Sequence, residues 1–286
     1  QLKNKYEMNP LCVTITPHTE TDLGIDNLKN FVKNDVNHIS INIDYESIRI
    51  LNKNGFIEVG FPYYGWVVAI STAPTVIAKN FGINLVFYGE DGEVEYGGVA
   101  KTKDQAIFDT KYQKKIYLEG GYEKVFEKFK IKNENLYFLK FPKNNSIKLT
   151  HWSYFENWDP YRNYLIAKDK YGLKESEATN QGTFTNFAQN DQALYSLHTY
   201  IMYLKFGFGR ATQDSSIEVR RGAMSREQAK NLIELYDGHF PMNYLDLYLD
   251  YYQMTKDSFY EILKKWTNKE LFEIKDNVWI KKFKII

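Results

Sequence analysis

The chain has 286 residues, of which 43% are hydrophobic and 26% are charged, and its formal net charge is +1. This length allows one large domain or two smaller ones, and the composition excludes a disordered chain. The near-zero net charge gives no overall attraction to nucleic acid or to an acidic membrane surface, and no apolar run reaches the roughly 18 residues of a membrane span. We therefore expect no nucleic acid and no membrane as partners, and a cytoplasmic location.

The single cysteine, Cys12, lies inside the apolar run Leu11–Ile15. One cysteine cannot form a disulfide within the chain or a thiolate zinc cluster. We expect Cys12 to be a small hydrophobic side chain in a buried strand.

Strands and helices alternate in the first part of the chain. We predict strands at 11–16, 38–43 and 83–88, and helices at 23–33, 45–54 and 65–80. Asp22 is a possible N-cap of the first helix, Gly55 ends the second, and Pro74 interrupts the third. This alternation predicts an α/β fold with a parallel sheet and right-handed crossovers.

The pattern is weaker between residues 99 and 148. We predict a helix at 112–128 that is broken at Gly120 and Gly121, and a short strand at 136–141. The lysine-rich segment around Pro142 is typical of a surface loop and marks a boundary.

The remainder of the chain is mostly helical. We predict helices at 161–171, at 191–206, from Ser225 to Asp237-Gly238, from Pro241, and from Thr255 to about Trp266, and then a hairpin at 271–283. Ser225 and Gln228 form a capping-box pattern, and Asp276-Asn277 suits a tight hairpin turn. The helix at 191–206 is apolar on nearly all sides, which predicts burial.

Two predicted strand ends carry candidate nucleotide ligands. The segment 88–98, YGEDGEVEYGG, holds four carboxylates and four glycines after a strand. Ligands bind outside the carboxyl ends of parallel strands, so this segment suits Mg²⁺ shared with a nucleotide; a solvated acidic turn is the alternative. The segment 14–19, TITPHT, could hydrogen-bond a nucleobase, although an ordinary loop histidine is the simpler reading. The candidates are Tyr88, Gly89, Thr16 and His18 for the nucleotide, and Glu90, Asp91 and Glu93 for the metal.

Two further segments suit a hydroxyl-rich substrate. The segment 150–163, THWSYFENWDPYRN, interleaves aromatic faces with polar groups, and the alternative is an aromatic hinge between domains. The segment 182–191, GTFTNFAQND, is dense in amides and hydroxyls, and the alternative is a capped helix entry with Asn190 or Asp191 as N-cap. The substrate candidates here are Trp152, Tyr154, Trp158 and Asn186.

The segment 204–226, LKFGFGRATQDSSIEVRRGAMSR, combines glycines with cations. Gly207 and Gly209 lie among Lys205, Arg210, Arg220, Arg221 and Arg226, with Asp214 and Glu218 between them. Glycines allow close backbone approach, and cations neutralise phosphate. The alternative is a helix C-terminus with Gly207 as cap, where Lys205 and Arg210 complement the helix dipole. Because that alternative explains at most two cations, a phosphate site is favoured.

Five stretches together resemble the N-acetyl sugar amidotransferases of the PP-loop ATP pyrophosphatase superfamily. They are NPLCVTITPHT, FYGEDGEVEYGG, THWSYFENWDPYRNYLIAK, GTFTNFAQND and KFGFGRATQDSSIEVRRGAMSR, in the family's order. Similar members act in making bacterial pseudaminic or legionaminic acids, and others act on lipopolysaccharide sugars. The resemblance implies a parallel sheet with flanking helices and a mostly helical C-terminal region.

The resemblance also implies a reaction and its cofactors, ATP and Mg²⁺. ATP adenylates the acetamido oxygen of an N-acetyl sugar, ammonia attacks the activated carbon, and AMP leaves to give an acetamidino group. Positively charged side chains would stabilise the developing charge; the catalytic candidates are Lys205, Arg210, Arg220 and Arg221, with Gly207 and Gly209 at the phosphates. Asp214 and Glu218 are assigned to the substrate.

The sequence departs from the family at its start. The family's phosphate loop, Ser-Gly-Gly-x-Asp-Ser after the first strand, and the N-terminal cysteines of relatives are absent, and Gln1–Tyr6 aligns with the helix that follows the loop. We therefore expect an N-terminally truncated chain that binds ATP poorly, lacking the first strand. The predicted regions are a truncated nucleotide-binding α/β domain at 1–100, an insertion or linker at 101–150, and a mainly helical substrate- and phosphate-binding region with a C-terminal hairpin at 151–286.

A glutaminase needs an exposed, activated thiolate, and Cys12 lies in the middle of a strand. The resemblance therefore implies separate glutaminase and cyclase-like subunits that supply ammonia. Two alternatives stay open: a non-catalytic module that binds sugars or nucleotides, and a related PP-loop enzyme that modifies tRNA, which the absence of a basic face disfavours.

Overall fold

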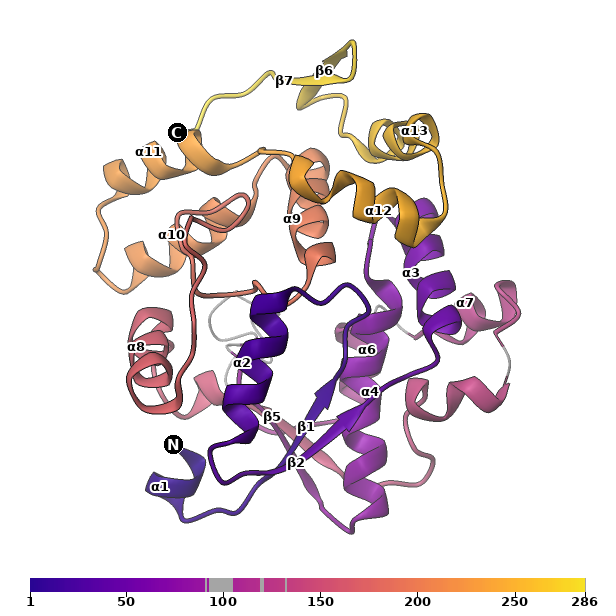
Figure 1. The fold of residues 1–286 in the computed structure, drawn as a ribbon, viewed down its shortest axis with the longest axis vertical. Helices are drawn as coiled ribbons and strands as arrows, with labels where there is room; N and C mark the ends of the chain where they lie inside the picture. The colour runs from indigo at the N-terminus through magenta and orange to yellow at the C-terminus, as the bar shows by residue number, and fades with distance from the viewer. Residues whose placement is uncertain (91, 93–104, 119–120, 132, 286) are drawn as a thin grey trace. The chain divides into compact units, whose positions relative to one another are not determined.

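The computed structural model describes residues 1–90, 92, 105–118, 121–131 and 133–285 (Figure 1). It divides into two compact units, each built from several segments of the chain. Unit 1 comprises Gln1–Thr16, Phe31–Ile48 and Gly65–Tyr171, and unit 2 comprises Pro17–Asn30, Arg49–Tyr64 and Gly172–Ile286. Segments of the two units alternate along the chain. The division into functional regions at 1–100, 101–150 and 151–286 remains a prediction.

Unit 1 contains two parallel strand pairs. β1 (Leu11–Ile15) pairs with β2 (Asn37–Ile41), and β3 (Leu85–Tyr88) pairs with β5 (Lys148–His151). β4 (Phe108–Asp109) adds to the other side of β5 in the antiparallel direction. Both parallel pairs end in register, since Ile15 lies opposite Ile41 and Tyr88 lies opposite His151. The carboxyl ends of each pair therefore lie at one edge, where ligands of parallel sheets bind.

The helical elements of unit 1 correct one prediction. They are α1 (Leu2–Tyr6), α6 (Thr110–Ile116), α7 (Glu123–Lys128), η1 (Asn133–Leu139), η2 (Trp152–Tyr154) and α8 (Pro160–Tyr171). The strand predicted at 136–141 is wrong, because residues 133–139 form the 3₁₀ helix η1. Its Leu136 and Leu139 are both buried, and residues three apart lie on one face of a 3₁₀ helix. Two described strands, β4 and β5, were not predicted, and β5 follows this segment.

Three helices contribute residues to both units: α2 (Asp22–Val32), α3 (Tyr45–Val59) and α4 (Tyr64–Asn80). Asp22 does not cap α2, because the Oγ1 of Thr21 accepts the amide hydrogen bond of Gly24 at 3.0 Å. α3 does not end at Gly55 but continues to Val59. A Cβ at Gly55 would lie 2.3 Å from the Cβ of Tyr64, so this glycine serves close packing. α4 continues through Pro74, with most of its residues buried.

Unit 2 is mostly helical. Its elements are α9 (Ala193–Phe206), α10 (Arg210–Arg220), α11 (Arg226–Tyr236), η3 (Met242–Tyr244), α12 (Leu245–Tyr252), α13 (Lys256–Trp266), β6 (Phe272–Lys275) and β7 (Val278–Lys281). α10 and α11 run side by side (Figure 1). Buried aromatic rings fill its core, and Tyr248 and Tyr252 donate their hydroxyls to the carbonyls of Ala193 and Pro62 at 2.8 and 2.6 Å.

Most local signals of unit 2 are confirmed. Ser225 and Gln228 form the predicted capping box, and Thr255 caps α13. Asp276 and Asn277 have φ of 49° and 61° between the antiparallel strands β6 and β7, as a type I′ turn requires. The cap in the alternative interpretation of the segment 182–191 is wrong: Gln192 occupies the N-cap position of α9, instead of Asn190 or Asp191, and makes no side-chain capping bond.

Candidate functional site

A buried arginine forms the centre of a polar network at the start of α10. Arg210 is 4% exposed. Its Nε donates to Oδ2 of Asp214 at 3.3 Å, and its Nη2 donates to the carbonyl of Ala188 at 3.1 Å. The guanidinium carbon lies 4.8 Å from the centre of the Tyr195 ring, a distance suited to a cation–π contact. The charge of Arg210 is therefore compensated within the protein.

Asp214 connects α10 to the segment 182–191. It accepts a hydrogen bond from Oγ1 of Thr183 at 2.6 Å, and the amide of Ala211 donates to the carbonyl of Gly182 at 2.9 Å. The segments GTFTNFAQND and KFGFGRATQD, which were predicted as separate sites, are therefore bonded to each other.

Asparagines fold the segment 176–190 onto itself. Asn186 donates its side-chain amide to the carbonyl of Ser176 at 2.9 Å, and Asn180 donates to the carbonyl of Ala188 at 2.7 Å. Ala188 thus accepts from both Asn180 and Arg210. The loop is therefore hydrogen-bonded to itself and to α10, and its residue Asn186, predicted to bind substrate, takes part in these bonds.

Asp237 is a member of this network that sequence reasoning missed. Its carboxylate accepts from the amides of Gly209 and Ala211, both at 2.8 Å, and from the hydroxyl of Thr212 at 2.6 Å. Burial raises the pKa of Asp237, and the hydrogen bonds from Thr212 and from the amides oppose that shift. No sequence signal indicates this contact, because Asp237 lies 28 positions from Gly209.

Two more carboxylates lie in unit 2 near this network. Asp191 is close enough to Arg210 for its charge to matter: burial raises the pKa of Asp191, and the Arg210 charge opposes the shift. Burial and the charge of Asp191 raise the pKa of Glu20. Glu20 pairs with Gln192 in an isolated antiparallel bridge, and His18 belongs to the same segment of unit 2, Pro17–Asn30.

The other predicted cations lie apart from Arg210. Arg221 donates to both carboxylate oxygens of Glu218, at 2.7 and 2.8 Å. Arg220 is exposed at the last position of α10, about 15 Å from its first residue at 1.5 Å per residue. The cations of the motif therefore do not surround one turn.

Lys205 and Gly207 belong to the end of α9. Lys205 donates to the carbonyl of Val59 at 3.2 Å, and its Nζ lies 5.2 Å from the centre of the Trp266 ring. Gly207, with φ of 79°, is the left-handed C-cap of α9. This arrangement agrees with the helix-terminus alternative for these two residues.

In unit 1, parallel pairing brings two predicted segments together. The rings of Tyr88 and His151 stack with centroids 5.3 Å apart. The ring of Phe108 also stacks with His151, at a centroid distance of 5.4 Å. Trp152 is buried and contacts the Phe87 ring at 5.8 Å. These aromatic side chains pack the strand ends of β3 and β5.

The remaining candidates of unit 1 are only partly placed. Thr16 follows β1, and its amide donates to the carbonyl of Ile41 at 3.1 Å. Gly89 and Glu90 follow β3 and are exposed, and Tyr154 and Trp158 are partly exposed. Asp91 and Glu93 lie outside the described residues. Among the described residues, no group of three or more His, Cys, Asp or Glu side chains is arranged to hold a metal ion, so the Mg²⁺ site remains a prediction.

His198 is another residue that the sequence did not single out. On α9, its ring lies 4.8 Å from Phe61 and 4.9 Å from Tyr63, and its Nδ1 is buried without a hydrogen-bond partner among the described residues. Burial, with a smaller contribution from the Lys205 charge, lowers the pKa of His198 to about 4. The imidazole is therefore neutral at neutral pH.

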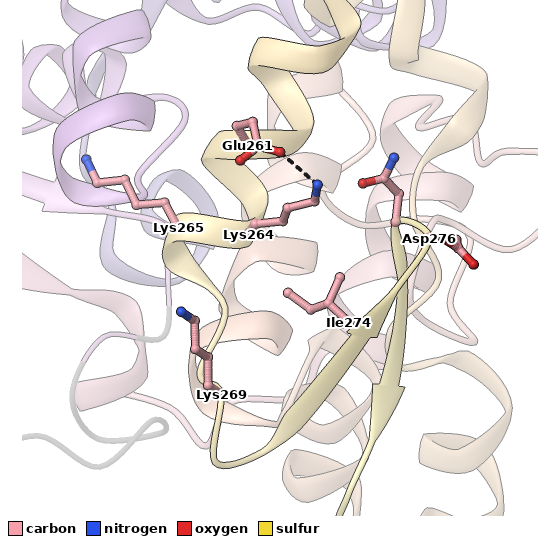
Figure 2. A pocket seen from close by; sticks show the side chains of 7 residues that line it. Glu261, Lys264, Lys265, Lys269, Ile274 and Asp276 are labelled. Atoms are coloured by element: carbon pink, nitrogen blue, oxygen red, sulfur yellow. Dashed lines mark hydrogen bonds and ion pairs between the residues drawn. The ribbon is translucent and has the colours of Figure 1, made fainter.

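An open hollow of about 740 Å³ lies between α13 and the β6–β7 hairpin (Figure 2). Lys264 in this hollow forms an ion pair with Glu261 at 2.7 Å, and Lys265 donates to the carbonyl of Ile57 at 2.7 Å. Its lining residues are Glu261, Lys264, Lys265, Lys269, Ile274, Asp276 and Asn277. Lysines near a helix C-terminus complement the helix dipole, which accounts for two of them without a ligand.

Cys12 lies within β1, and burial raises the pKa of its thiol. A thiol with a raised pKa is a poor nucleophile at neutral pH. This setting agrees with the prediction that Cys12 is a structural side chain.

No helix within the described part of the chain is long and apolar enough to cross a membrane. No curated protein matches the chain. Residues 181–285, which include the loop 182–190, Arg210, Asp214 and Asp237, match the family model of the C-terminal domain of WbpG-like LPS biosynthesis proteins, so the chain is similar over this region to a lipopolysaccharide biosynthesis protein.

Proposed function

We propose that the protein is an ATP-dependent amidotransferase that converts the acetamido group of a bacterial surface sugar into an acetamidino group. Two similarities support the proposal. Residues 181–285 match a lipopolysaccharide biosynthesis domain, and five stretches spread along the chain resemble the N-acetyl sugar amidotransferases. Both similarities include the segments GTFTNFAQND and KFGFGRATQD.

The observation that carries the proposal is the buried network that joins these two segments. Burying a charged arginine requires a well-placed partner and further hydrogen bonds, which Asp214, Ala188 and Thr183 supply. The network bonds α10 to a loop rich in amides and hydroxyls. Such a loop offers neutral donors and acceptors, the groups that recognise sugar hydroxyls.

The overall reaction consumes ATP and ammonia and releases AMP and pyrophosphate, because an amide oxygen leaves only after it is esterified to phosphate. The residues at the start of α10 do not fit the ATP triphosphate, since Asp237 already accepts from the amides of Gly209 and Ala211. We therefore assign the α10 network to the sugar, and ATP and Mg²⁺ to the strand ends of unit 1, near Tyr88, Gly89 and Glu90. Ammonia would come from separate glutaminase and cyclase-like subunits.

The test uses the complete natural gene product with ATP, Mg²⁺, ammonium and a panel of N-acetyl sugars, free and nucleotide-linked. We expect AMP release that requires both the sugar and ammonium, and a product in which mass spectrometry finds the acetamido oxygen replaced by NH. AMP release that does not depend on the sugar, or the absence of AMP release with every sugar of the panel, would contradict the proposal.

A second candidate is a sugar-binding module without turnover. It is favoured by one observation: Lys205, Arg210 and Arg221 each make hydrogen bonds to other groups of the protein, which reduces their capacity to stabilise charge on a substrate. Calorimetry separates the two candidates, because the module would bind a sugar nucleotide in the presence of ATP and ammonium without releasing AMP. No observation of this kind favours the third hypothesis, an enzyme that modifies tRNA.

A further inference from the structure

The start of α10 has the features of an anion site, but a carboxylate of the same chain fills it. The first amides of a helix lack partners within the helix and carry a partial positive charge, so they commonly bind phosphate. Here Asp237 Oδ2 accepts from Gly209, and Oδ1 accepts from Ala211. The Thr212 hydroxyl donates to the same carboxylate at 2.6 Å.

Two glycines make this approach possible. A Cβ at Gly209 would lie 2.7 Å from Oδ1 of Asp237, closer than any side chain allows. Gly238, directly after Asp237, has φ of 85°, and a Cβ there would lie 2.5 Å from the Tyr203 ring. Gly209, which the sequence indicated as a place where backbone approaches phosphate, thus accommodates Asp237.

We propose that Asp237 is a positioning residue that acts as a built-in anion at the start of α10 and, through Arg210, positions the loop 182–190 that the proposed function assigns to the sugar. The carboxylate fixes the amides on both sides of Arg210. Arg210 in turn holds Ala188 and pairs with Asp214. Asp237 therefore acts on the loop 182–190 through α10, without touching the loop in a described contact.

Three carboxylates interact with Arg210 or with the amides next to it. Asp214 is bonded to Arg210, Asp191 interacts with its charge, and Asp237 holds the adjoining amides. The inference rests on the proposed function only for the assignment of the loop 182–190 to the sugar.

The first test is anion rescue of the Asp237→Ala variant. We expect its thermal unfolding midpoint to fall by several degrees and to recover in part with sodium formate, the smallest carboxylate, at constant ionic strength. Wild type and the control Asp250→Ala, an exposed aspartate near the end of α12, should respond to neither formate nor inorganic phosphate. Failure of formate to restore Asp237→Ala, or stabilisation of the wild type by phosphate through residues 209–212 in hydrogen exchange, would overturn the inference.

The second test uses Asp237→Asn, which keeps the shape if the alanine variant does not fold. The side-chain NH2 of asparagine would face some of the N–H and O–H groups from which the carboxylate accepts. Because two donors cannot bond to each other, the first turn of α10 and Arg210 should shift. We expect the KM for the sugar to rise about tenfold and the KM for ATP to change less than about twofold. A rise confined to the ATP KM would overturn the inference.

The two proposals fail separately. If the complete protein shows no turnover but formate restores Asp237→Ala, the proposed function falls and the built-in anion stands, with sugar binding by calorimetry replacing the kinetic test. If the protein is active but formate has no effect, the built-in anion falls and the function stands.

Discussion

The neighbouring helices α10 and α11 begin in different ways. α11 begins at a neutral, exposed capping box, in which Ser225 accepts from the Gln228 amide at 3.2 Å and Gln228 accepts from the Ser225 amide at 2.9 Å. α10 begins at the Asp237 carboxylate, which comes from the far end of α11, and its first residue is a buried arginine. One start is built from four consecutive residues, and the other from segments distant in sequence.

The difference decides how far a defect spreads. Loss of the α11 cap affects one helix end, where water can replace the lost bonds. Loss of a group from the α10 start affects α10, the loop 182–190 and the junction after α11 together, because Arg210, Asp214 and Asp237 bond to all three. The free-energy losses from mutating groups that share a network are not additive.

The largest effect is expected from replacing Arg210, the buried charged side chain of the α10 start. Arg210→Ala removes the partner of Asp214 and leaves the Ala188 carbonyl with fewer donors. Removing one member of a buried pair destabilises by about 3–5 kcal/mol, and we expect a loss near the lower value because Asp214 keeps its bond to Thr183. Urea unfolding measures the loss.

The matched control is Arg226→Ala. Arg226 occupies the first position of α11, as Arg210 does in α10, but it is exposed. We expect a change within about 0.5 kcal/mol, as for most exposed positions. Equal losses for Arg210→Ala and Arg226→Ala would show that the α10 network does not stabilise the fold.

Measuring stability against pH sharpens the comparison, because the titrating side chain of His198 contacts the same aromatic ring as Arg210. The ring of His198 lies 6.2 Å from Tyr195, which stacks on Arg210. Burial lowers the pKa of His198 from 6.5 to about 4. The unfolded chain therefore binds a proton below pH 6.5 that the folded protein does not bind until about pH 4, so folding stability falls as the pH decreases through this window.

The expected size is at most about 3.5 kcal/mol, from about 1.4 kcal/mol for each unit of pKa shift. His198→Phe should abolish that part of the decrease between pH 7 and pH 4.5 in urea unfolding. Replacement of the exposed His239 by phenylalanine should leave it intact. An unchanged pH dependence in His198→Phe would contradict the assignment.

The sequence predicted the parts of this comparison that are local. Ser225 with Gln228, Thr255, and Asp276 with Asn277 each act within a few residues, so their spacing is enough. The Arg210–Asp214 pair was also readable in principle, because residues four apart meet on a helix face, but both were assigned to ligands. Asp237 and the Thr183–Asp214 bond could not be predicted, since they depend on the path of the chain between distant segments.

The same reason explains the errors in the fold. Residues 136–141 have strand-like composition, but the burial of Leu136 and Leu139 selects a 3₁₀ helix. Gly55 and Pro74 are local terminators by propensity, yet tertiary packing keeps α3 and α4 continuous through them. The pairing of β3 with β5 joins Tyr88 to His151 across more than 60 positions, which no local pattern indicates.

The smallest expected effect concerns the local cap. Ser225→Ala should destabilise by about 1 kcal/mol and Ser225→Gly by a few tenths, because glycine leaves the first amides open to water. Urea unfolding at constant pH measures both, and neither loss should vary with pH, because the cap contains no titrating group. A pH-dependent loss, or one as large as that of Arg210→Ala, would mean that α11 is coupled through Asp237 to the charged network, and the two helix starts would then act as one.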